Sequence, residues 1–137
     1  IVKEYLDSLK FFLKELKKHN ANFVLFYPTP EFKDFIPQFC TEEWFRSKSQ
    51  SNKCLVYDAN QLRQNRIFFM KELEKLALEE SNFYIFDAFR LFCDDNACKS
   101  SINGEVMFID EYHLSMKGTN YIEKFFNEFL VKNNLLK

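Results

Sequence analysis

At 137 residues the chain is long enough for one domain with a buried core and too short for two ordinary domains. Its formal net charge is −1 and its acidic and basic residues are interleaved, which disfavours a basic face for nucleic acid. No apolar run approaches the roughly 20 residues that span a bilayer, and the opening IVKEYLDSLK lacks the apolar block of a signal peptide. We therefore look for one site in a globular domain.

The first two predicted elements are a helix and a strand. Apolar residues recur at three- and four-residue steps over residues 1–18, which predicts an amphipathic helix. Lys17 and Lys18 favour its C-terminal end, and Asn20 is suited to a left-handed cap. Residues 22–27 (NFVLFY) form an almost continuous apolar run that stops at Pro28. Such a run predicts a central strand, buried on both faces of a parallel sheet.

The rest of the chain continues this alternation. Residues 31–57 lack periodicity, which predicts a long ordered loop. Asp58 can cap the next turn, and the pattern from there to about residue 80 predicts a second amphipathic helix. Residues 82–86 (NFYIF) repeat the strand pattern, residues 106–109 predict a short extended segment, and a third helix follows from Ser115. The order predicts an α/β fold with a parallel sheet flanked by helices, in a single domain over residues 1–137.

Four cysteines form two pairs that are close in the sequence, Cys40 with Cys54 and Cys93 with Cys98. Four cysteines permit three connectivities, and proximity favours the local pairing. Zinc binding and free thiols are the alternatives, but neither spacing is the C-x₂-C of a structural zinc site and the two histidines are far apart. We expect two disulfides, no metal site and an oxidising compartment.

The most informative segment is residues 108–118 (FIDEYHLSMKG), which places Asp110 three residues before His113 and just before a helix. A histidine that moves protons in hydrolysis needs a carboxylate on one ring nitrogen, which fixes its tautomer and stabilises the imidazolium. Asp110 is placed to do this. Ser115 is interpreted as the N-cap of the next helix and not as a nucleophile. On its own, a D-x-x-H pattern more often marks a structural hydrogen bond than a catalytic pair.

A family resemblance adds to this pattern. The segment DEYHLSMKG resembles the final block of the SGNH (GDSL-like) hydrolases, in the form attached to integral-membrane sugar O-acyltransferases. The strand and proline loop FVLFYPTP, the segment IPQFC that ends at Cys40, and the segment LFCDDNAC occur in that family's order. The resemblance covers most of the chain and implies an SGNH or flavodoxin-like three-layer α/β fold.

The resemblance also implies a function. It makes His113 the general base and Asp110 its orienting partner, acting on a serine that takes an acyl group and passes it to a hydroxyl. The implied reaction is O-acyl transfer, with acetyl as the expected group, to cell-envelope carbohydrate, or ester hydrolysis on it, without a cofactor. The implied partners are an acyl donor, a carbohydrate acceptor and an N-terminal or separate membrane acyltransferase domain. The implied place is the periplasmic or extracellular face of a bacterial membrane.

The chain departs from the family pattern at the nucleophile. Its two glycines are Gly104 and Gly118, and neither precedes Asp-Ser, so the G-D-S block is absent. A sheet built on NFVLFY and NFYIF would also leave one edge bare. We therefore expect the C-terminal portion of an SGNH-like domain that is incomplete on its N-terminal side. The alternative is a catalytically inactive domain that binds a glycan or a membrane acyltransferase partner, so the sequence leaves open whether the chain is an enzyme.

The loop Pro28, Thr29 and Pro30 is a further candidate for substrate contact. It follows a predicted strand, and α/β sheets bind ligands beyond the carboxyl ends of their strands. A rigid turn without a binding role is the alternative interpretation.

Overall fold

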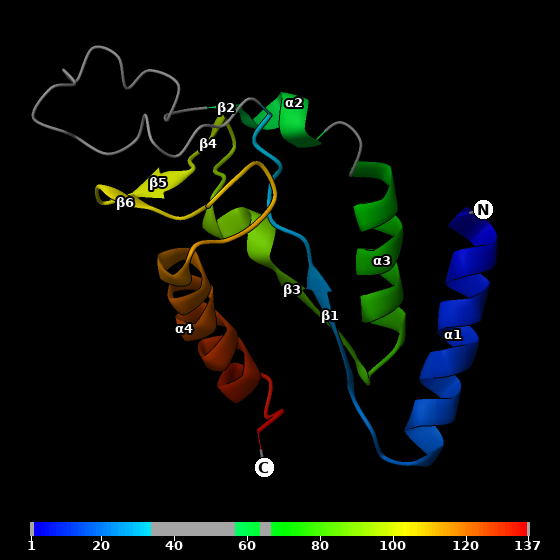
Figure 1. Ribbon diagram of the computed structural model, residues 1–137. Helices are drawn as coiled ribbons and strands as arrows, with labels where there is room; N and C mark the ends of the chain where they lie inside the picture. Colours follow the sequence, from blue (N-terminus) through cyan, green and yellow to red (C-terminus); the bar gives the residue numbers. More distant parts are fainter. Residues whose placement is uncertain (1, 34–56, 64–66, 137) are drawn as a thin grey trace, which may run out of the picture.

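The computed structural model describes residues 2–33, 57–63 and 67–136 (Figure 1). Its helices are α1 (Val2–Lys18), α2 (Ala59–Arg63), α3 (Ile67–Glu79), the short 3₁₀ helix η3 (Ala88–Leu91) and α4 (Met116–Lys132). Its strands are β1 (Phe23–Tyr27), β2 (Tyr57–Asp58), β3 (Phe83–Asp87), β4 (Ala97–Cys98), β5 (Ser101–Ile102) and β6 (Glu105–Val106).

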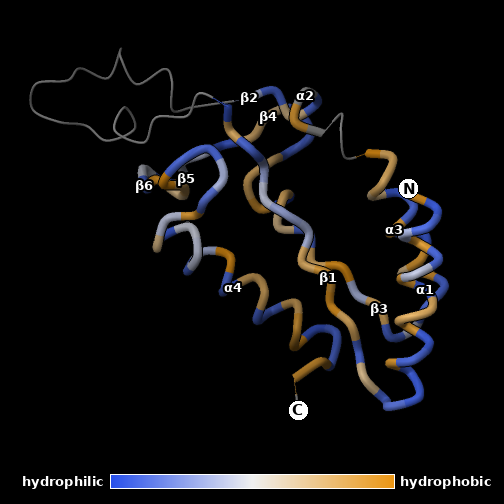
Figure 2. The backbone as a smooth tube through the Cα atoms, turned by 45° about the vertical axis from the view of Figure 1, so that its right-hand side comes forward, coloured by the Kyte–Doolittle hydropathy of each residue, from blue (hydrophilic) through white to orange (hydrophobic). Residues whose placement is uncertain are grey.

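The centre of the fold is a parallel pair of strands. β1 pairs with β3 in a register that runs from Phe23 opposite Phe83 to Tyr27 opposite Asp87. This confirms the predicted parallel sheet. Because both strands run the same way, their carboxyl ends meet at one edge, where the proline loop and η3 begin (Figure 1). Figure 2 shows mainly hydrophobic colouring along both strands. Along α1 and α4, hydrophobic and hydrophilic colouring alternate.

Helices α1 and α3 cover one face of the sheet. Leu9 and Leu13 of α1 are buried with Leu73 and Leu76 of α3, and they share one apolar cluster with Phe23 and other residues of that face. The chain turns from α1 into β1 at Asn20, which has φ of +53° and therefore provides the predicted left-handed cap. Buried Asn82 ties this layer together, since its amide donates to the Leu13 carbonyl at 2.9 Å and the Ala21 carbonyl at 3.3 Å.

Helix α4 covers the opposite face. Phe86 of β3 lies edge-on to Phe126 and Phe129 of α4, with ring centroids 5.0 and 5.4 Å apart. Ile122 of α4 is buried in the same cluster. Since successive residues of a strand point to opposite faces, the two strands separate the α4 layer from the α1 and α3 layer. The described residues therefore form an α/β arrangement with helices on both faces of the sheet.

One prediction about β1, its central place in the sheet, stays a prediction. β1 was predicted to be a central strand buried on both faces, but within these residues it has β3 as its single partner, and Phe26 is 44% exposed. The physical reason is that one edge of β1 is unpaired there, so side chains next to that edge lack a neighbouring strand to cover them. The run NFVLFY is as apolar as a central strand needs, and the bare edge that the sequence predicted is the edge of β1 that is unpaired among the described residues.

Two other elements differ from the predictions in detail. The predicted second helix is described as α2 and α3, and residues 64–66 between them lie outside the described residues. The predicted extended segment at residues 106–109 overlaps β6, which forms a hairpin with β5. Asn103 and Gly104 make the turn, both with positive φ. An Asn-Gly pair between short extended segments is a strong hairpin signal, so the sequence contained this information.

Candidate functional site

The candidate site lies on a tight turn that joins the β6 segment to α4. Phe108 and Leu114 form an isolated antiparallel bridge, and the Ile109 amide donates to the His113 carbonyl at 2.8 Å. These contacts close residues 109–113 into a loop whose two ends lie side by side. Phe108 is fully buried beneath the loop, so the turn is anchored in the core.

Asp110 holds the inside of this turn. Its Oδ1 accepts hydrogen bonds from the main-chain amides of Tyr112 and His113, each at 2.8 Å. An Asp side chain that bonds the amides two and three residues ahead fixes a turn locally. The carboxylate is therefore positioned by the backbone as well as by its contact with the histidine ring.

His113 completes the pair that the sequence predicted. Its Nδ1 lies 2.8 Å from Asp110 Oδ2 and 3.0 Å from Oδ1. A neutral imidazole donates from Nδ1 to this carboxylate, which leaves Nε2 as the proton acceptor. The His113 side chain is 72% exposed, so a reacting group can approach it from solvent. This is the orientation that a general base requires.

The electrostatics of the pair follow from these hydrogen bonds. The pKa of Asp110 is lowered from 3.8 to about 2, first by the Tyr112 amide, then by the His113 amide and the His113 ring. Donors that point at a carboxylate stabilise its charged form. Asp110 is therefore ionised at neutral pH and can stabilise a positive charge that forms on His113.

Aromatic packing supports the turn from below. The Phe108 ring lies edge-on to Phe32, which follows the proline loop, and to Phe92, which follows η3, with centroids 4.8 and 5.0 Å apart. All three side chains are buried. The loops after both strands of the sheet thus meet beneath the Asp110–His113 turn. Phe32 begins a segment that was predicted to be a long loop, where no periodicity indicated that its side chain is buried.

The proline loop lies against the same turn. The Phe32 amide donates to the Glu111 carbonyl at 3.0 Å, which joins the chain after β1 to the centre of the turn. Pro28 is exposed, Thr29 is half-buried and Pro30 is fully buried. Burial of Pro30 accords with the rigid-turn interpretation for that residue. Pro28 is exposed, and its contact with substrate stays a prediction.

Ser115 begins α4, as predicted. Its Oγ accepts the Gly118 amide at 3.1 Å and donates to the Val106 carbonyl at 2.7 Å, and its own amide donates to the Met107 carbonyl at 2.8 Å. The hydroxyl is thus engaged as a helix cap. This confirms the prediction that Ser115 is the N-cap of α4.

The cysteine prediction is testable for one pair. Cys93 and Cys98 form a disulfide that brackets the short loop after η3. Cys40 and Cys54 lie outside the described residues. Across residues 2–33, 57–63 and 67–136, no group of three or more histidine, cysteine or acidic side chains is arranged to hold a metal ion.

No candidate nucleophile is seen beside His113 among the described residues. In the part of the chain that the structure describes, Asp110 is the hydrogen-bond partner of the His113 ring, and no serine hydroxyl is bonded to it. None of the described helices is both long and apolar enough to cross a bilayer.

The described residues thus form an α/β domain that carries an Asp–His pair on a hydrogen-bonded turn beyond the carboxyl ends of its parallel strands. The chain belongs to the SGNH domain family: the family model described as "SGNH domain (fused to AT3 domains)" matches residues 2–128. This confirms the resemblance and links the chain to a family associated with membrane acyltransferases. No curated protein and no solved structure matches the chain.

Proposed function

We propose that this chain is the C-terminal portion of an SGNH-type O-acyltransferase or esterase domain, in which His113 is the general base and Asp110 orients it. The observation that carries the proposal is the pair of contacts from His113 Nδ1 to the Asp110 carboxylate, which is itself held by two main-chain amides. A carboxylate fixed in this way sets the histidine tautomer and leaves Nε2 available.

The nucleophilic serine comes from polypeptide outside these 137 residues, because the sequence has no G-D-S block. The unpaired edge of β1 is the place for the strand that carries it. Phe26 at that edge is 44% exposed, and Phe12 of the neighbouring α1 is 45% exposed and lies edge-on to Phe23. An apolar strand beside β1 would cover these rings. Running parallel to β1, it would end at the same edge as the Asp110–His113 turn.

The reaction follows serine-hydrolase chemistry. The serine oxygen attacks the acyl carbonyl of the donor while its proton passes to His113 Nε2, and the leaving group of the donor takes that proton as it departs. A hydroxyl of the acceptor then attacks the acyl-enzyme and gives its proton to Nε2, and the proton returns to the released serine. A sugar hydroxyl as acceptor gives transfer, and water gives hydrolysis.

The substrates and location of this reaction are part of the proposal. We infer acetyl as the acyl group and cell-envelope carbohydrate as the acceptor, with Pro28 and Thr29 as substrate contacts. The family's fusion to AT3 domains supports a membrane acyltransferase as the source of the acyl group. The Cys93–Cys98 disulfide supports an oxidising place, which here is the periplasmic or extracellular face of the membrane.

A catalytically inactive domain that binds a glycan or a membrane partner is the second candidate function. The missing G-D-S block is the observation that favours it. The two candidates differ in one observable feature, the coding sequence upstream of Ile1. A G-D-S segment after an apolar strand supports the enzyme, and a continuous upstream sequence without it supports the binding domain.

The decisive experiment measures p-nitrophenyl acetate hydrolysis by the protein extended upstream through its G-D-S segment. His113→Gln should lower kcat by about 10²–10⁴-fold, because general-base catalysis is lost. Asp110→Asn should lower kcat by up to about 10⁴-fold, since it favours the wrong tautomer.

The matched control is His19→Gln, which changes the same residue type at an exposed position just after α1, in the turn before β1. It should leave kcat unchanged. Equal rates for the extended wild type and His113→Gln would reject the catalytic assignment.

A further inference from the structure

The outer edge of β3 presents main-chain groups that no other described strand pairs with. The Phe23 amide donates to the Asn82 carbonyl. Because the main-chain groups of a strand point alternately to its two sides, those of Tyr84 and Phe86 also point toward β1 in this parallel register. Those of Phe83 and Ile85 point the opposite way. The Phe83 amide is satisfied by the Glu80 carbonyl at 3.1 Å. Among the described residues, the amide and carbonyl of Ile85 have no main-chain partner.

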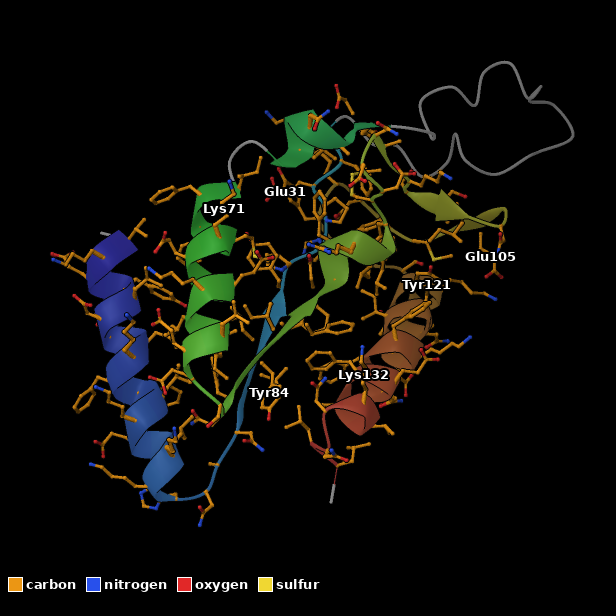
Figure 3. The ribbon with its side chains drawn as sticks, turned by 180° about the vertical axis from the view of Figure 1, so that it is seen from behind. Glu31, Lys71, Tyr84, Glu105, Tyr121 and Lys132 are labelled. Atoms are coloured by element: carbon orange, nitrogen blue, oxygen red, sulfur yellow. A yellow bond between two sulfur atoms is a disulfide. The ribbon has the colours of Figure 1, made fainter. Side chains whose placement is uncertain are left out.

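A groove runs along this edge. One cavity of about 560 Å³ is lined by Tyr84 and Ile85 of β3, by Leu78 and other residues of α3, and by Phe129 of α4. A second cavity of about 590 Å³ lies beyond the carboxyl end of β3. The two share lining residues, among them Glu74 and Arg90, so they form one continuous depression. Figure 3, seen from the β3 side, shows Tyr84 between α3 and α4.

The groove is acidic. Its two parts are lined by five carboxylates and two cationic side chains, namely Glu74, Glu80, Asp87, Asp94, Asp95, Lys71 and Arg90. The carboxyl end of α4 also reaches the groove at Asn133, and a helix C-terminus carries partial negative charge. The part of the groove beside β3 has three of these carboxylates and one cation, namely Glu74, Glu80, Asp87 and Arg90.

Arg90 bridges the groove where its two parts meet. Its Nε lies 3.1 Å from Asp87 Oδ2, and another guanidinium nitrogen lies 3.8 Å from Glu74 Oε1. The Arg90 side chain is 73% exposed, and an exposed ion pair at the longer distance contributes little stability. An incoming cation can therefore take the place of Arg90 on Glu74 at small cost.

We propose that this groove binds an extended, lysine- or arginine-bearing segment of a partner protein, which adds to β3 as a further strand. Such strand addition uses main-chain hydrogen bonds for affinity and alternate side chains for specificity. The outward-facing amide and carbonyl of Ile85 supply those bonds. Leu78, 90% exposed on the α3 wall, offers an apolar contact, and the carboxylates bind basic side chains of the segment.

The test uses a fluorescent eight-residue peptide of alternating lysine and valine, added to the 137-residue chain. Fluorescence anisotropy should show saturable binding that weakens at least tenfold between 50 and 500 mM salt. Salt should weaken it because the charge pairs are screened, with a Debye length of about 10 Å at 0.1 M. Hydrogen exchange should slow at the Ile85 amide. The Val24 amide at the opposite edge of the sheet is the internal control and should be unchanged.

The matched variants are Glu74→Lys with Glu80→Lys inside the groove, and Glu4→Lys with Asp7→Lys on α1 outside it. Both change the charge equally, and the first pair alone should weaken binding at least tenfold, provided both variants keep the wild-type circular dichroism spectrum. Equal binding of a glutamate–valine peptide, protection of Val24 in place of Ile85, or equal weakening by both pairs would overturn the proposal. So would self-association of the chain that excludes the peptide.

Discussion

Gly118 in the first turn of α4 lies directly against the main chain of Met107. A Cβ at Gly118 would overlap the Met107 carbonyl oxygen, which already accepts the Ser115 amide, and would press on the Leu114 side chain at 3.0 Å. The start of α4 and the strand segment before the Asp110–His113 turn are therefore packed without space between them. The glycine is needed for this close approach and not for an unusual φ.

The first prediction concerns this contact. Gly118→Ala should destabilise the fold by about 1–3 kcal/mol, because overpacking against a main-chain oxygen outweighs the better helix propensity of alanine. Urea denaturation followed by circular dichroism measures the change. Asn120→Ala, at an exposed position of α4, is the control and should change stability by less than about 0.5 kcal/mol. An unchanged midpoint for Gly118→Ala would show that α4 shifts freely away from Met107.

The second prediction concerns pH. The pKa of Asp110 is about 2 in the folded chain, below the ordinary value of 3.8, chiefly because of the Tyr112 amide. A carboxyl with a depressed folded pKa stabilises the fold above its unfolded pKa, and this contribution disappears as pH falls through the folded pKa. The stability advantage of wild type over Asp110→Asn should therefore be full above about pH 4 and decline toward pH 2. Urea titrations at pH 6, 4, 3 and 2 measure it, and a constant difference would contradict the assignment.

The third prediction concerns Asn82, whose amide holds the end of α1 against the sheet. Asn82→Ala should cost about 1–3 kcal/mol, because it leaves the Leu13 carbonyl without its donor in a buried place. Asn82→Asp should cost more, since a carboxylate would face that carbonyl. Asn22→Ala, at an exposed position directly before β1, is the control. Thermal unfolding ranks the three, and a smaller loss for Asp than for Ala would exclude the donor role.

The fourth prediction concerns the Cys93–Cys98 bridge. Replacing both residues with serine should lower stability by about 2 kcal/mol, since the bridge closes a short loop and chain-entropy stabilisation grows slowly with loop length. The comparison of wild type and double variant in urea, both without reductant, isolates this bridge from the other cysteines. Equal stability would indicate that the packing of Phe92 and Phe108 holds this loop without the bridge.

Local signals in the sequence predicted much of the fold. Spacing and residue type were enough to predict the apolar face of α1, the Asn20 cap, the two apolar strands and the Ser115 cap. Asp110 and His113 were found for the same reason, since their contact spans three residues within one turn. The Asn103–Gly104 hairpin was equally local and was missed.

Contacts between residues far apart in the chain could not be predicted from the sequence. Burial of Phe32 depends on Phe108, far away in the chain, and no periodicity marks it. The sequence predicted one bare edge of the sheet, but its composition did not show that this edge belongs to β1. The groove at β3 depends on the spacing of α3 and α4 across the strand.

The pairing of Phe23 with Phe83 also sets the order in which the chain can fold. About sixty residues must be made after β1 before it can pair with β3. The entropy cost of closing so long a loop comes before the contact contributes any stability. The β5–β6 hairpin and α4 form from neighbouring residues and have no such delay. Until β3 is made, the edge of NFVLFY that faces β3 is thus the unpaired edge of an uncharged strand-forming segment, the kind that aggregates with copies of itself. A holdase chaperone that covers it until β3 emerges would raise the yield of folded protein.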